Sequence, residues 1–322
     1  AVAELRSKGN DQVYSVGAHF PRSSNSVIGL YLNRPLFIPT DIIYDVAPAM
    51  TLDRCLTLLY GWKNGGMNYG LLISIAMDKF SDEEFGVEEK QSARYIGISA
   101  GVSSDTYDLG LQLELPAASW EEGDDEDKWS GTGIGLNGRI FSKKSEELEL
   151  VGLGRLYLGF SGREVGDAEI NYNQFNLEIG GAANYQLNKN NMAVLAVEAF
   201  GMDQSKIVVK DGDEVTYKTT TLPGIYLGIE SQVKSWLVAR LGARQVYQSI
   251  SEMMNPEYGD ETEESSYTSS FSVSLGLGIV VGNLELDALF NEGILFDGPN
   301  FISGQNNTLA NKISLTYHFN KP

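Results

Sequence analysis

The stretch SSFSVSLGLGIVVGNLELDALF, residues Ser269–Phe290, decides the fold. Apolar side chains occupy every second position on both sides of the pair Gly282-Asn283, and small, polar or acidic residues fill most positions between them. A period of two places alternate side chains on opposite faces of a β-strand. A Gly-Asn pair between two such runs predicts a tight hairpin. The stretch therefore predicts two antiparallel strands, each with one apolar and one small or polar face.

The same alternation recurs from about Ser26 to Phe319 and predicts about fourteen strands, almost without helix-period segments. Short turns alternate with long, mostly acidic or polar connections, which include 80–91, 120–129, 203–220 and 252–266. An even number of strands with short turns at one end and long loops at the other is typical of bacterial outer-membrane barrels. The sequence therefore predicts an all-β fold, a transmembrane antiparallel up-and-down barrel.

Composition excludes several other classes of protein. The chain has 322 residues and a formal charge of −19, which argues against nucleic acid as a partner because binding to phosphates requires Lys and Arg. A single cysteine, Cys55, excludes an internal disulfide framework and a cysteine-based zinc site. No apolar run approaches the roughly 20 residues of a membrane helix.

A soluble β-sandwich would also alternate apolar and polar residues. Three features favour the membrane barrel instead. Many of the expected strands exceed the five or six residues usual in soluble proteins, and charges of both signs lie in the middle of strands. Trp62 and Trp236 lie beside short turns, and Trp120 and Trp129 bracket a long loop, as expected of aromatic residues at the two membrane interfaces.

The polar face of the strands is the expected wall of the lumen and supplies the candidate functional residues. In a water-filled pore such charges would set a transverse field and a weak ion selectivity, whereas in a plugged barrel they would pair with one another. The predicted lumen-lining or binding residues are Asp108, Glu114, Arg139, Arg155, Glu178, Glu198, Glu230, Arg240, Arg244, Glu285 and Asp287.

Two parts of the chain are expected. Residues 1–24, with Gly9, Gly17 and Pro21, predict an irregular N-terminal segment in the lumen or the periplasm. Residues 25–322 predict the transmembrane barrel. Whether the lumen is open or plugged stays open, because both arrangements place charge inward.

The final strand, NKISLTYHF at 311–319, resembles the closing strand of Gram-negative outer-membrane barrels, which commonly ends in Phe. The expected strand count and the N-terminal segment are similar to those of the fatty-acid-transporter (FadL-like) barrels. The Asn-Pro-Ala element of that family's hatch is missing here, since the one Asn-Pro pair is Asn255-Pro256 in a loop. The resemblance therefore carries over no ligand residues.

Catalysis is not expected. The two histidines, His19 and His318, have no accompanying nucleophile motif, so the sequence predicts neither an enzyme nor a cofactor. Acidic runs such as 124–127 predict a solvated outer surface. A second interpretation of these runs is weak divalent-ion binding next to lipopolysaccharide phosphates.

The expected function is passive passage of small solutes or hydrophobic ligands across a bacterial outer membrane. The alternative is a barrel that transports nothing and anchors or escorts a protein partner at its loops or periplasmic face. The expected surroundings are outer-membrane lipid and lipopolysaccharide.

Overall fold

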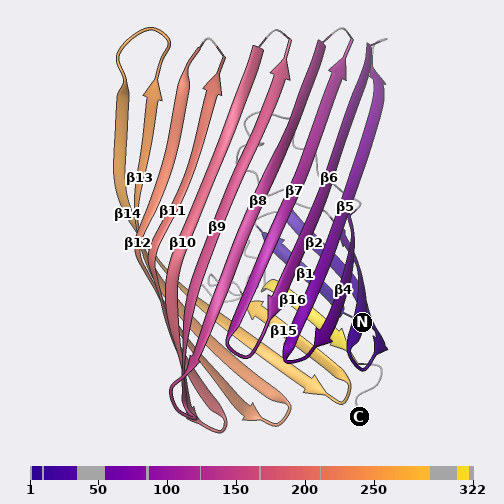
Figure 1. Cartoon of the computed structure of the whole chain (residues 1–322), viewed down its shortest axis with the longest axis vertical. Coiled ribbons are helices and arrows are strands. Elements are labelled where there is room, and N and C mark those ends of the chain that lie inside the picture. Colours follow the sequence, from indigo (N-terminus) through magenta and orange to yellow (C-terminus); the bar gives the residue numbers. More distant parts are fainter. Residues whose placement is uncertain are drawn as a thin grey trace, which may run out of the picture.

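The sheet closes on itself. The computed structural model describes residues 2–8, 11–34, 55–84, 87–123, 125–166, 168–210, 212–290 and 310–318. Over these residues the chain forms sixteen antiparallel strands, and the first pairs with the last (Figure 1). No described residues form a helix long and apolar enough to cross a membrane. The predicted all-β, up-and-down architecture is confirmed.

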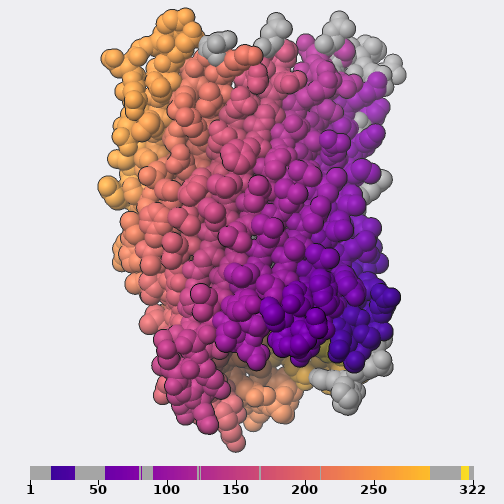
Figure 2. All heavy atoms as spheres, in the orientation of Figure 1, coloured from indigo at the N-terminus to yellow at the C-terminus, as the bar shows by residue number. Residues whose placement is uncertain are grey.

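The strands fall into a short and a long group. Six strands of 7 to 13 residues lie side by side around the closure: β1 (Val2–Lys8), β2 (Asp11–Ser23), β3 (Ser26–Arg34), β4 (Cys55–Asn64), β15 (Leu284–Phe290) and β16 (Ala310–Tyr317). Ten strands of 16 to 21 residues form the rest of the wall: β5 (Met67–Glu84), β6 (Val87–Ser103), β7 (Tyr107–Glu122), β8 (Asp125–Lys143), β9 (Leu148–Val165), β10 (Ala168–Asn188), β11 (Asn191–Val209), β12 (Glu214–Lys234), β13 (Leu237–Asn255) and β14 (Thr262–Val281). Figure 2 shows the outside of this long-stranded wall as a continuous surface.

The N-terminal segment differs from the sequence expectation. All fourteen expected strands are present, and β1 and β2 are two more, formed by a segment that was expected to be irregular apart from a short candidate strand at 13–19. β1 pairs with β2 on one side and with β16 on the other. The seven residues of β1 offer only Ala3 and Leu5 as alternating apolar positions, too few to reveal a strand. Ala1 and residues 9–10 of the expected segment lie outside the described residues, as does Phe319 of the final strand.

The outer face of the wall carries a continuous apolar band. The register places large apolar side chains of neighbouring strands level with one another, as in the row Ile98, Leu113 and Ile134. Exposed members of the band on β5 to β8 include Leu71, Ile73, Ile75, Ile96, Ile98, Leu109, Leu111, Leu115, Ile134, Leu136 and Ile140. Apolar side chains exposed in this way all round a closed sheet fit a lipid environment.

Aromatic side chains mark the short-turn end of this band. Trp62 stacks between Tyr60 and Tyr69, with ring centroids 5.4 and 5.2 Å apart. Trp236 is exposed beside the turn between β12 and β13. This agrees with a membrane-interface girdle at that end. Trp129, expected at the opposite interface, is instead 6% exposed and on the inner face, paired with Arg163 of β9.

The long polar connections expected from the sequence are mostly strand. Residues 120–122 and 125–129 belong to the ends of β7 and β8, and residues 203–209 and 214–220 belong to those of β11 and β12. A strand of about 20 residues is roughly 65 Å long and rises about 50 Å at a tilt near 40°, about twice the height of the apolar band. The wall therefore projects beyond the membrane, where water on both sides removes the apolar alternation but not the backbone pairing.

Outward positions become polar where this projection begins. Going up β6 and β8, the outward series continues from Ile96 to Arg94 and from Ile134 to Lys128. Lys128 Nζ lies 2.6 Å from Glu126 Oε1, and this hydrogen bond raises the pKa of Lys128. Ion pairs on the outer face lie in water, so Lys128 and Glu126 mark the level at which the wall leaves the lipid.

The two faces of β6 give a direct test of orientation. Replacing Ile98 with Arg places a charge on the lipid side, and we expect the free energy of unfolding in phospholipid vesicles to fall by about 2–4 kcal/mol. Ser99→Arg is the matched control, because the next residue faces inward beside a cavity of about 270 Å³. An equal or larger loss for Ser99→Arg in urea titrations would contradict the assignment of faces.

Candidate functional site

The eleven predicted residues all lie on the inner face. Cross-strand pairs connect them: Asp108 is level with Arg139, Arg155 with Glu178, and Glu230 with Arg240. The same register continues to Asp287 and Glu285 on β15. The inner wall from β7 to β15 is therefore a polar belt, opposite the apolar band. That these residues bind a solute stays a prediction.

Arg240 is the most fully paired of the four arginines. Its Nε lies 2.7 Å from Glu230 Oε2, and its Nη1 lies 2.7 Å from Asp287 Oδ1. The three side chains come from β12, β13 and β15, so they form a bridge across four neighbouring strands. They line a cavity of about 550 Å³ with Ser274 and Ser314.

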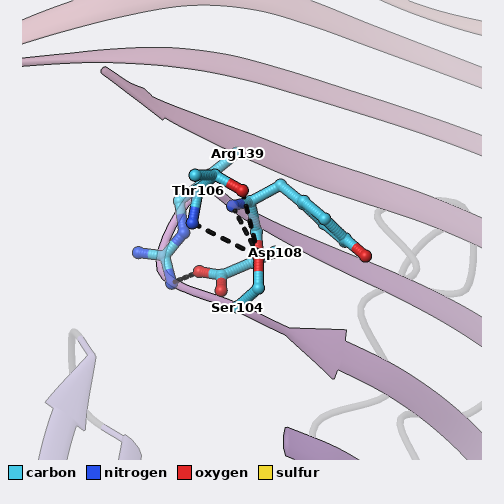
Figure 3. A network of polar contacts seen from close by, with 5 residues as sticks. Ser104, Thr106, Asp108 and Arg139 are labelled. Atoms are coloured by element: carbon cyan, nitrogen blue, oxygen red, sulfur yellow. Dashed lines mark hydrogen bonds and ion pairs between the residues drawn. The ribbon is translucent and has the colours of Figure 1, made fainter. Parts of the chain in front are cut away.

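A second ion pair lies at the short turn between β6 and β7. Figure 3 shows Arg139 reaching Asp108, to which its Nη2 donates a hydrogen bond. The turn is fixed by Ser104, whose Oγ accepts the Thr106 amide at 3.2 Å. The Thr106 carbonyl in turn accepts the Phe141 amide of β8 at 2.8 Å. The pair thus sits on a hydrogen-bonded junction between two hairpins.

The remaining predicted charges make contacts of varied length. Arg155 Nη1 and Glu178 Oε1 are 3.7 Å apart, and both side chains are more than 40% exposed. Glu198 Oε2 accepts the hydroxyl of Tyr226 at 2.7 Å. The other contacts are Arg244 Nε to Ser272 Oγ at 2.8 Å and His318 Nε2 to Glu285 Oε2 at 3.6 Å.

Glu114 is different, because it is buried within the inner wall. Its exposed fraction is 5%, and it accepts three hydrogen bonds: from Tyr95 at 2.7 Å, Gln112 at 2.6 Å and Tyr157 at 3.0 Å. Tyr95 in turn packs near the buried residues Cys55 and Ala76. Glu114 therefore ties β6, β7 and β9 together and is not available to a solute in the lumen.

Sequence reasoning missed the tyrosines and a second buried cluster. Arg163 binds Asp127 through two nitrogens, with Nε 2.9 Å from Oδ1, beside the nearly inaccessible Tyr172. The alternation of inward and outward positions could have identified them, because Tyr95, Tyr157 and Tyr226 occupy inward positions of their strands. A tyrosine on the polar face is a hydrogen-bond donor for a neighbouring carboxylate.

A cavity of about 670 Å³ lies against β7 to β12. Its polar lining comes from Asp108, Asn137, Arg139, Arg155, Glu178, Glu198 and Tyr226. In the part of the chain that the structure describes, no three His, Cys, Asp or Glu side chains gather closely enough to hold a metal ion. The polar side chains of this lining offer hydrogen bonding and ion pairing.

The closed sheet, its even number of described strands and the apolar outer band are the defining features of one class of membrane protein. The protein has the fold of a transmembrane β-barrel. No protein-family model matches its sequence, and no curated protein matches it. The narrower resemblance to fatty-acid-transporter barrels stays a prediction; the described residues form sixteen strands, where about fourteen were expected.

Solved structures with a distant likeness are outer-membrane barrels. The translocator domain of the autotransporter NalP from Neisseria meningitidis is 14% identical, with a TM-score of 0.38 over 80% of this chain and 90% of that one. The ferric-catecholate import receptor Fiu from E. coli K12 is 6% identical, with a TM-score of 0.41 over 99% and 81%. CdiB from Acinetobacter baumannii is 11% identical, with a TM-score of 0.42 over 98% and 59%. These likenesses concern the general fold and carry no argument about function.

The Glu114 cluster predicts a loss of stability when a donor is removed. Tyr157→Phe leaves one oxygen of a buried carboxyl group without its partner, so we expect the free energy of unfolding to fall by about 1–3 kcal/mol. Tyr185→Phe is the control, because Tyr185 is exposed on the outer face and should change it by less than about 0.5 kcal/mol. Equal stabilities of the two variants in urea titrations would show that Glu114 does not tie the strands.

Proposed function

We propose that the protein is a passive channel for small polar solutes across the bacterial outer membrane. The observation that supports this most strongly is the polar belt on the inner wall from β7 to β15, with adjoining cavities of about 670 and 550 Å³. Apolar side chains such as Leu153 and Val194 also line the cavities, but a hydrophobic ligand would remove water from the neighbouring charges without replacing their hydrogen bonds. Polar solutes would exchange hydration for hydrogen bonds to Arg, Glu, Asn and Tyr.

The belt favours cations. Seven of the eleven predicted lumen residues are carboxylates and four are arginines. Fixed charge on a pore wall selects the mobile ion of opposite sign. Glu114 is buried, but the remaining six carboxylates still outnumber the arginines.

The N-terminal residues are not expected to act as a removable plug. β1 and β2 belong to the wall, and β1 carries the pairing to β16. Deleting residues 1–24 would open a sheet edge in lipid, which costs unpaired backbone groups. The expected result of the deletion is a failure to fold, not an increase in conductance.

The projecting wall favours a second candidate, a barrel that engages a protein partner. Tyr258, in the connection between β13 and β14, and Tyr267, near the start of β14, are 84% and 86% exposed. Exposed tyrosines are frequent anchors of protein interfaces. In this alternative the lumen residues would serve stability, and the projecting ends would carry the function.

Planar-bilayer recordings test the channel. We expect a steady conductance with a preference for K⁺ over Cl⁻, and a smaller preference for the double variant Glu178→Gln/Glu198→Gln. Glu126→Gln is the control, because it removes an exposed carboxylate on the outer face. A correctly folded protein without conductance, together with a protein that co-purifies through β13 and β14, would support the second candidate instead.

A further inference from the structure

The cavity of about 670 Å³ carries charges of both signs: Asp108 of β7 accepts a hydrogen bond from Arg139, and two arginines are followed along the wall by two glutamates. Arg139 and Arg155 come from the neighbouring strands β8 and β9, and Glu178 and Glu198 come from β10 and β11. The register places Glu198 level with Gly180, two residues from Glu178 on the same face. The cavity wall thus changes from cationic to anionic between β9 and β10.

These charges retain capacity for a ligand. Arg139 and Arg155 are 57% and 58% exposed, and each has one carboxylate partner among the described ion pairs. A guanidinium has five N–H donors. Arg240 provides the contrast, since two carboxylates at 2.7 Å engage both of its sides and its exposed fraction is 42%. The Arg240 cluster is satisfied internally, whereas the charges of the larger cavity are only partly paired.

Glu198 is held in a defined position. A side chain on Gly201 would place its Cβ 2.0 Å from Glu198 Oε1, so the carboxylate lies in space that only glycine leaves free. The Tyr226 hydroxyl donates to Oε2 from the next strand. A register shift between Ile179 and Gly180 brings both Glu198 and Gly201 to the inner face. Such bulges re-aim side chains next to sites.

We propose that this cavity binds small zwitterions with one carboxylate and one ammonium group, such as amino acids and dipeptides. Arg139 and Arg155 bind the carboxylate, because planar guanidinium groups match its geometry. Glu198 and Glu178 bind the ammonium group. The volume lies within the range of small-molecule sites. The inference rests on the proposed channel function and adds its class of solute.

Calorimetric titration of the detergent-solubilised barrel tests this without requiring conductance. The probes are alanyl-alanine, its N-acetyl derivative, which lacks the ammonium group, and its amide, which lacks the carboxylate. We expect alanyl-alanine to bind at least about tenfold more tightly than either derivative, because each derivative loses one charged hydrogen-bonding group.

Two variants separate the charges. Arg155→Gln should weaken alanyl-alanine and the N-acetyl derivative about tenfold and leave the amide unchanged. Glu198→Gln should do the reverse, weakening alanyl-alanine and the amide only. Arg155→Lys should restore part of the affinity, and Lys128→Gln, on the exposed outer face, should leave all three probes unchanged.

Equal affinity for the three probes, or equal losses for all three in both variants, would overturn the zwitterion site. So would the absence of heat with alanyl-alanine at millimolar concentration. A barrel that conducts ions but fails this test would keep the channel function and lose only the site. A barrel that binds the dipeptide without conducting would lose the channel function instead.

Discussion

The hydrogen-bonded ladder between β1 and β16 is the contact on which the rest of the structure depends. It runs from the pair Val2–Thr316 to the pair Arg6–Lys312 and closes the sheet. In hydrocarbon no water can satisfy a free strand edge, and each unpaired backbone group costs several kcal/mol. Closure removes those edges and gives the wall an inside and an outside. The apolar band and the polar belt are consequences of that division.

The alternation of side chains along each strand then decides whether a side chain faces lipid or the lumen. A slip of one residue in any ladder would exchange lipid-facing and lumen-facing positions, so the contrast between the two faces fixes the register. The described wall departs from strict alternation near Glu198, with register shifts at Ile179/Gly180 in β10 and Thr221/Gly224 in β12. These two register shifts lie on the strands on either side of Glu198, which lines the cavity of about 670 Å³. The cavity with charges of both signs therefore coincides with register shifts in the sheet.

The sequence predicts the strands that cross the membrane, because lipid requires an apolar outer face. It does not predict the parts of the strands that project into water. Fourteen strands and eleven inward charges are predictable, because lipid requires apolar residues at alternate positions. The projecting ends, such as residues 120–129, show no alternation because water covers both faces, and the short β1 has too few apolar positions. The partners of Glu114 and Glu198 lie on neighbouring strands, so alternation places Tyr95 and Tyr226 on the inner face but does not show which carboxylate each one meets. Trp129 was expected at a membrane interface because it lies beside a long loop, but it occupies an inward position of β8.

Cysteine cross-linking across the closure tests the central claim most directly. With Cys55 replaced by Ser, the double variant Ala3→Cys/Leu315→Cys places thiols on paired residues of neighbouring strands, within disulfide range. Closure predicts efficient oxidation of the folded, heat-modifiable protein. It also predicts none for Ala3→Cys/Leu286→Cys, since β16 lies between those strands at a spacing of about 5 Å per strand. A folded barrel in which the 3–315 pair stays reduced would contradict a wall closed by β1.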